Sequence, residues 1–157
     1  QAQAWFDSSP VPSIQGYNIQ DQYKIPELST GEMMSKLIKD HYRRFNIELV
    51  CETYTLGNTF FPTEKTTRAM VGNKPFIVYG PRGFLTNLQQ QENFKTFSSL
   101  WDESYDQLEG LSRWNAIVKL IDYLLSLPTK EWCQVIQEAS TIAQHNRHIL
   151  KKIINDC

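Results

Sequence analysis

The stretch FFPTEKTTRAMVGNKPFIVYGPRGF, residues 60–84, decides the predicted fold. Residues 75–79, PFIVY, form a short and continuously apolar run rich in β-forming residues, which is typical of a strand covered on both faces. Before this run, Pro62 and Thr63 predict a helix start, and Gly72 and Asn73 predict its end. After it, the turn at residues 80–83 leads into a second predicted helix, residues 84–88. The order helix, strand, helix indicates a parallel α/β arrangement.

The segments before this stretch predict one more strand and one more helix. Residues 45–51, FNIELVC, alternate between apolar and polar positions, as a partly exposed strand does. Ser29 and Glu32 form a capping box, and apolar residues at helical spacing behind it predict a helix over about residues 30–44. Residues 1–29 contain Pro, Gln and Ser without periodicity and predict an irregular arm.

The segments after the stretch predict a short third strand and a helical pair. The strand is expected around residues 94–97, and two amphipathic helices are expected on either side of Pro128. Trp114 and Trp132 lie on the apolar stripes of these helices and are expected in the core. We therefore expect a single α/β domain over residues 30–157, with a small parallel Rossmann-like sheet flanked by helices and a C-terminal helical pair.

Composition limits the classes of partner. Sixteen Lys and Arg residues against seventeen Asp and Glu residues give a net charge of −1, so a nucleic-acid partner is not expected. The three cysteines are widely spaced and suggest neither a disulfide framework nor a zinc site, which fits a reducing, cytoplasmic location. No apolar run approaches the roughly 20 residues of a membrane span, and residues 1–10 lack the features of a signal peptide.

Charged residues and glycines follow both predicted strands, where ligands of open α/β sheets bind. The candidate ligand-binding residues are Glu52, Glu64, Lys65, Gly80, Arg82 and Gly83. Helix N-termini at this edge favour phosphate binding. The Lys65 ammonium group could contribute a positive charge, and the Arg82 guanidinium group could donate two hydrogen bonds to oxygens of a diphosphate. The Glu64 carboxylate could accept hydrogen bonds from two ribose hydroxyls. Gly80 and Gly83 would permit close backbone approach.

The same residues have plainer interpretations. The turn at residues 80–83 matches neither the dinucleotide fingerprint nor the P-loop, so it can be a tight strand-to-helix turn. Glu64 and Lys65 can be a solvated pair worth a few tenths of a kcal/mol.

Two further groups of residues could bind a metal. Asp102, Glu103 and Asp106 can be surface caps and turns or, with other oxygen ligands, a Mg²⁺ site for phosphate-ester chemistry. His145 and His148 share one helix face, but no third ligand is in view, so we expect a solvated face and no metal.

Residues 47–84 resemble the donor-binding half of glycosyltransferases with two Rossmann-like domains, the GT-B type. The resemblance lies in IELVCET, followed by TEK and by KPFIVYGP. The nearest pattern is that of fucosyltransferases, in which a strand ending in Phe-Glu-Asn is followed by Tyr-Val-Thr-Glu-Lys and then Val-Pro-Val-Val-Leu-Gly. Residues 47–105 also resemble a group of uncharacterised phage and marine microbial proteins that share TEKT, PFIV and DESYD.

This resemblance implies that Glu64 binds the nucleotide ribose, that Lys65 binds the diphosphate, and that Glu52 lies near the sugar or shapes its pocket. Phe61 and Thr53 depart from the pattern, where the fucosyltransferases have Tyr and Asn. The implied ligand is a nucleotide diphosphate sugar, a substrate that needs neither cofactor nor obligatory metal.

The resemblance also implies a half-enzyme. The general base of such enzymes usually comes from a second Rossmann-like domain, so activity from these residues alone is not expected. The alternative from another class is a non-catalytic α/β interaction domain, cellular or viral, without nucleotide binding.

Overall fold

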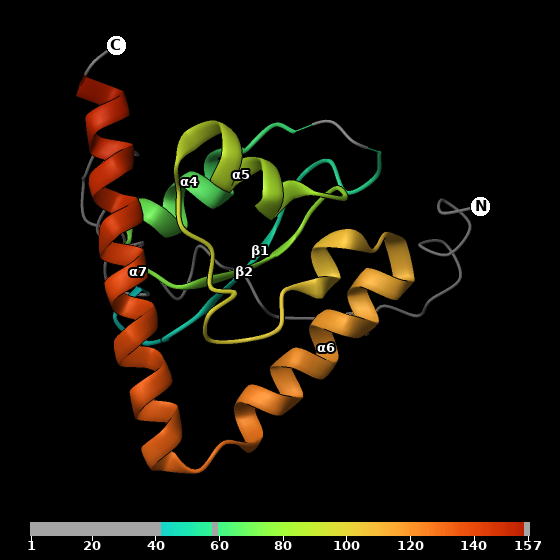
Figure 1. The fold of residues 1–157 in the computed structure, drawn as a ribbon, viewed down its shortest axis with the longest axis vertical. Coiled ribbons are helices and arrows are strands. Elements are labelled where there is room, and N and C mark those ends of the chain that lie inside the picture. Colours follow the sequence, from blue (N-terminus) through green and yellow to red (C-terminus); the bar gives the residue numbers. More distant parts are fainter. Residues whose placement is uncertain (1–41, 58–59, 156–157) are drawn as a thin grey trace, which may run out of the picture. The chain divides into compact units, whose positions relative to one another are not determined.

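The computed structural model describes residues 42–57 and 60–155 (Figure 1). In chain order the elements are β1 (Glu48–Cys51), α4 (Glu64–Val71), β2 (Phe76–Tyr79), α5 (Phe84–Glu92), the 3₁₀ helix η1 (Ser104–Gln107), α6 (Gly110–Ser126) and α7 (Thr129–Asn155). The described residues form a mixed α/β fold with a two-stranded parallel sheet and four α-helices. The predicted arm, residues 1–29, and the predicted helix up to residue 41 lie outside the described residues.

The sheet confirms the two predicted parallel strands. β1 pairs with β2 in the register Glu48↔Phe76 to Cys51↔Tyr79, and α4 forms the crossover between them. One further hydrogen bond, Glu52 N to Tyr79 O at 2.9 Å, extends the ladder at its carboxyl end. The loops that follow the two strands therefore begin side by side at one edge of the sheet, which we call the carboxyl edge.

The predicted third strand at residues 94–97 is wrong, because this segment pairs with a side chain instead of a strand. The Asn146 side chain on α7 accepts from Lys95 N and donates to Lys95 O, both at 2.8 Å. Asn146 is fully buried, so its amide satisfies the backbone of this segment in the way that a neighbouring strand would. The segment contributes Phe94 and Phe97 to the core without joining the sheet.

The core lies between β2, α5, α6 and the loop after α5. Its aromatic centre is Phe76, which meets Phe97 edge to face at 5.2 Å between ring centroids. Other fully buried apolar side chains include Val50, Ala69, Val78, Phe84, Leu88, Ile117 and Ala139. Since these residues come from both strands and all four helices, one core joins the described elements.

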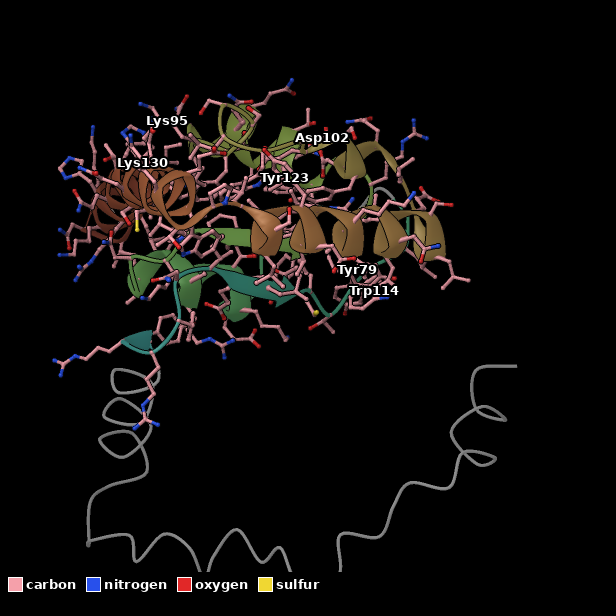
Figure 2. All side chains as sticks on the ribbon, turned by 90° about the horizontal axis from the view of Figure 1, so that it is seen from below. Tyr79, Lys95, Asp102, Trp114, Tyr123 and Lys130 are labelled. Atoms are coloured by element: carbon pink, nitrogen blue, oxygen red, sulfur yellow. The ribbon has the colours of Figure 1, made fainter. Side chains whose placement is uncertain are left out.

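The two C-terminal helices were predicted correctly, but one expected core residue was not. Trp114 is 38% exposed and packs edge to face on Tyr79 at 5.6 Å, at the rim of the domain (Figure 2). The buried face of α6 instead runs through Arg113, Ile117, Leu120 and Leu124. Trp114 stands one position away from this face because Arg113 takes the inward place. Trp132 is partly buried against the core.

The helical pair divides its contacts between two parts of the domain. α7 packs on α4, whereas α6 packs on β2 and η1, and a short turn at residues 127–128 joins them (Figure 1). None of the helices in the described part of the chain combines the length and the apolar character that a membrane crossing requires.

Candidate functional site

The carboxyl edge is formed by the loop after β1, the turn after β2, and the first turns of α4 and α5. Parallel sheets bind ligands at this edge, where helix N-termini offer N–H groups and partial positive charge. The six predicted site residues all lie on these segments. The structure separates them into residues that build the edge and residues that are accessible on it.

Glu52 is buried beneath the carboxyl edge and holds the start of α4. Its side chain is 5% exposed, and its carboxylate accepts hydrogen bonds from Thr63 N at 3.2 Å, from the Thr63 hydroxyl, and from the Thr66 hydroxyl at 2.5 Å. Thr63 is the N-cap of α4, and its hydroxyl oxygen accepts from Lys65 N at 3.3 Å. Glu52 therefore joins the first turn of α4 to the end of β1 and shapes the carboxyl edge.

Asp106, which lies on η1, occupies the N-terminus of α5. Its carboxylate oxygens accept from Leu85 N at 3.0 Å and from Thr86 N at 3.1 Å, and its backbone oxygen accepts from Gly83 N at 2.8 Å. The Thr86 hydroxyl donates to the same carboxylate at 3.0 Å. The expectation that this helix N-terminus faces a ligand is therefore wrong, because a carboxylate of the chain itself already takes these donors.

Arg113 completes this arrangement and was missed by the sequence analysis. The side chain is fully buried, and it donates to Val78 O at 3.1 Å, to Pro81 O at 3.0 Å, and to Asp106 at 3.2 Å through both the backbone oxygen and Oδ1. It joins the end of β2, the turn after it, η1 and α6. The signal in the sequence is a charged residue four positions before Ile117, on the buried face of the helix.

The structure explains why glycine occupies both positions 80 and 83 in the turn after β2. Gly80 is buried, and a Cβ atom there would lie 3.3 Å from Val78 Cγ1 and 3.5 Å from the Phe84 ring. Gly83 has φ of +74°, a left-handed conformation that favours glycine. The plainer interpretation of a strand-to-helix turn accounts for these two residues. Arg82, between them, is exposed.

Glu64, Lys65 and Arg82 are the accessible charges of the edge. Lys65 Nζ donates to Thr53 Oγ1 at 2.9 Å and pairs with Glu64 Oε1 at 3.1 Å, and the side chains of Lys65 and Glu64 are 32% and 78% exposed. The hydrogen bond from Lys65 is the main reason that the pKa of Glu64 lies below its ordinary value. Within the described residues, no ion pair joins Arg82 to either of them. The structure thus brings Glu64 and Lys65 together and puts Arg82 on the neighbouring loop.

The loop after β1 also exposes three large apolar side chains. Tyr54, Leu56 and Phe61 are 59%, 70% and 61% exposed. Tyr54 adjoins Thr53, the residue that holds the Lys65 ammonium group. Exposed aromatic faces can stack on a nucleobase or contact a protein partner.

The acidic residues after α5 are engaged in hydrogen bonds within the chain. The Asp102 carboxylate accepts from both the backbone N–H and the hydroxyl of Ser104, each at 2.9 Å. Glu103 accepts from Phe97 N at 3.0 Å, and its burial raises its pKa to about 7. Asp106 caps α5. Among the described residues, which include His145 and His148, no group of three or more metal-ligating side chains could hold an ion.

No family model, curated protein or solved structure matches this chain.

Proposed function

We propose that this protein binds a nucleotide diphosphate sugar at the carboxyl edge, through Lys65, Arg82 and Glu64. The observation that supports this most is the accessibility of these three charges, two on the first turn of α4 and one on the turn after β2, at one edge of a parallel sheet. No hydrogen bond or ion pair within the described residues uses the Arg82 side chain, so the fold gives no structural reason for it. The β1–α4–β2 unit has the strand–helix–strand connectivity that presents ligand-binding segments in open α/β folds.

The diphosphate would be held by side chains and not by helix N-termini. Asp106 fills the N-terminus of α5, and Glu52 and Thr63 hold the first turn of α4. Lys65 and Arg82 therefore supply the positive charge that neutralises the phosphates. Two partly exposed cations bind an anion in competition with salt, so the affinity should fall as ionic strength rises.

The remaining parts of the ligand have candidate contacts on the first turn of α4 and on the loop after β1. Glu64 would exchange its exposed pair with Lys65 for the ribose hydroxyls, because a solvent-exposed ion pair is weak and easily replaced. Tyr54 and Phe61 offer exposed rings for the base. In this arrangement Glu52 acts only by positioning α4.

Transfer of the sugar needs a general base for the acceptor hydroxyl. None of the three accessible residues is suited to that role, because Lys65 and Arg82 are cationic and Glu64 is assigned to the ribose. The proposed role is therefore donor binding. The general base would come from a second Rossmann-like domain.

A thermal-shift screen tests the proposal. GDP, UDP, CDP and ADP sugars are added to the wild type, to Lys65→Ala/Arg82→Ala, and to a matched control, Arg147→Ala/Lys151→Ala, which removes two exposed cations from α7. A ligand at a hundred times its Kd adds about 2.7 kcal/mol to the stability of the wild type and the control. The double variant at the carboxyl edge should show no such gain.

A non-catalytic interaction domain is the second candidate, favoured by the exposed Tyr54, Leu56 and Phe61 and by the occupied N-terminus of α5. If the wild type responds to none of the four nucleotide classes, the first proposal fails and this second one is retained.

A further inference from the structure

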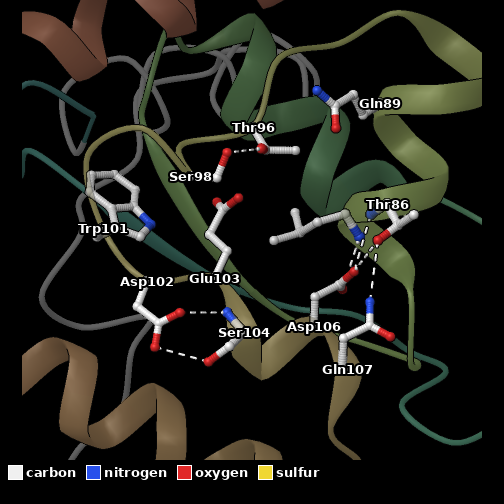
Figure 3. Close-up of a pocket in the computed structure, with 11 residues that line it drawn as sticks. Thr86, Gln89, Thr96, Ser98, Trp101, Asp102, Glu103, Ser104, Asp106 and Gln107 are labelled. Atoms are coloured by element: carbon white, nitrogen blue, oxygen red, sulfur yellow. Dashed lines mark hydrogen bonds between the residues drawn. The ribbon is translucent and has the colours of Figure 1, made fainter.

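A polar pocket lies between α5, the loop after α5, and η1 (Figure 3). It has a volume of about 340 Å³ and is lined by residues of α5, of the loop after α5, and of η1. This volume is at the lower end of ligand-binding pockets, which suits a small molecule. None of the lining residues belongs to the loop after β1 or to the turn at residues 80–83, so this pocket is a separate feature.

Trp101 supplies an unused hydrogen-bond donor at this pocket. The residue is 4% exposed, and its ring stacks on Phe97 with 4.9 Å between centroids. The indole nitrogen is buried and has no acceptor within the described residues. Figure 3 shows the nitrogen directed toward the interior of the pocket. Because buried polar groups are nearly always paired with protein, water or ligand, this N–H offers a donor to an acceptor oxygen that enters the pocket.

The walls of the pocket carry neutral hydrogen-bonding groups and carboxylates. Hydroxyls come from Thr96 and Ser98, which share a hydrogen bond of 3.3 Å, and side-chain amides come from Gln89 and Gln107. Three carboxyl groups also line it, but no Lys, Arg or His does. An anion such as phosphate would therefore meet only negative charge there.

Other ligand classes fit less well. The carboxylates of Asp102 and Asp106 are engaged with Ser104 and with the first turn of α5, and no metal-binding group is present among the described residues. An ammonium ion could pair with Glu103 but has no oxygen for the Trp101 N–H. An apolar ligand would bury the hydroxyl and amide groups without partners.

We propose that this pocket binds a small neutral polyhydroxylated ligand of monosaccharide size. A ligand hydroxyl oxygen accepts from Trp101 Nε1, and ligand hydroxyl hydrogens are accepted by Glu103, Thr96 and Ser98. A hydroxyl group both donates and accepts, so a polyol satisfies the indole and the carboxylate together. The site does not rest on the proposed nucleotide binding, since the two share no residue.

The indole N–H resonances give a direct test. The chain has four Trp residues, so a ¹H–¹⁵N spectrum has four indole signals, and the signal lost in Trp101→Phe belongs to Trp101. D-glucose, D-galactose, D-mannose, L-fucose and N-acetylglucosamine are titrated separately into the labelled full chain, up to tens of millimolar. At least one sugar should move the Trp101 signal in a saturable way while the other indole signals stay in place.

Variants and competing probes make the test specific. Thr96→Val/Ser98→Ala should raise the Kd of the responding sugar about tenfold, the loss expected for two hydrogen bonds. The matched control Ser112→Ala/Thr141→Val, at exposed positions of α6 and α7, should leave it unchanged. Should Trp101→Phe fail to fold, triple-resonance assignment of the wild type identifies the signal.

Three results would overturn the proposal. These are no response to any of the five sugars, an equal Kd in Thr96→Val/Ser98→Ala and the wild type, and a Trp101 response only to Mg²⁺ or methylguanidinium. UDP alone serves as a separate arm. It should leave the Trp101 signal in place even if it binds at the carboxyl edge, so failure of one proposal is distinguishable from failure of the other.

Discussion

Replacing Arg113 by Met should destabilise the domain by about 3–5 kcal/mol, the cost of leaving one partner of a buried ion pair alone. The guanidinium group is fully buried and makes hydrogen bonds to Val78 O, to Pro81 O, and to both the backbone and the side chain of Asp106. A Met side chain occupies a similar space but has no hydrogen-bond donor. The Asp106 carboxylate then keeps only its bonds to α5, and the carbonyl oxygens of Val78 and Pro81 lose their bonds from the guanidinium group.

One observation places the expected cost at the lower end of this range. Arg113 Nε is buried without a hydrogen-bond partner in the described residues, so its removal relieves one desolvation penalty. We therefore expect about 3 kcal/mol, which is a large part of the roughly 5–15 kcal/mol that stabilises a typical domain.

Urea unfolding at pH 7, followed by circular dichroism and by tryptophan fluorescence, measures this effect. The control Arg147→Met removes an exposed Arg from α7 and should change the stability by less than about 0.5 kcal/mol. The double variant Arg113→Met/Asp106→Asn should cost at least about 1 kcal/mol less than the sum of its single variants, because the two groups interact directly. A loss below about 1 kcal/mol for Arg113→Met would refute the reasoning that this pair joins β2, η1 and α6.

Three further substitutions test other parts of the structure. Glu52→Gln should lower the free energy of unfolding in urea by about 1–3 kcal/mol, because the buried carboxylate accepts three hydrogen bonds from the first turn of α4. The control Glu64→Gln, at an exposed position, should change the stability little. Equal effects of the two substitutions would contradict the role of Glu52 in holding α4. Glu103 has its pKa raised from 4.5 to about 7, so the folded protein binds this proton more tightly than the unfolded chain does. Wild-type stability should therefore fall by up to about 3 kcal/mol as the pH rises from 4.5 to 7, and the fall should shrink in Glu103→Gln; parallel pH curves would contradict this. Gly72→Ala should cost about 1–3 kcal/mol by thermal unfolding, because the new Cβ would lie 2.3 Å from the Tyr42 ring, and an unchanged Tm would contradict that contact.

The sequence predicted the elements whose signals are local. The apolar run at residues 75–79 and the alternating segment before it became β2 and β1, trimmed by one residue and by three. The helix start at Thr63 and the helix end at Gly72 were both correct, since each depends on side chains within one turn. The helix after residues 80–83 and the two helices around Pro128 followed from the same kind of pattern.

The sequence could not predict features that join distant residues. Asp106 caps α5 across 21 positions, Arg113 reaches Val78 across 35, and Asn146 replaces a strand partner of Lys95 across 51. Nothing in the composition of these segments indicates such pairs. Asp106 occupies the N-terminus of α5. The proposed anion site therefore consists of side chains only, and not of helix N-termini as the sequence analysis expected.

The most direct test of the proposed function is to map where a nucleotide diphosphate sugar binds, by backbone ¹H–¹⁵N spectra during titration with GDP, UDP, CDP and ADP sugars. We expect one class to shift the signals of Glu64, Lys65 and Arg82 most, and to leave those of α7 in place. Shifts centred elsewhere, or no shift with any of the four classes, would contradict nucleotide-sugar binding at the carboxyl edge.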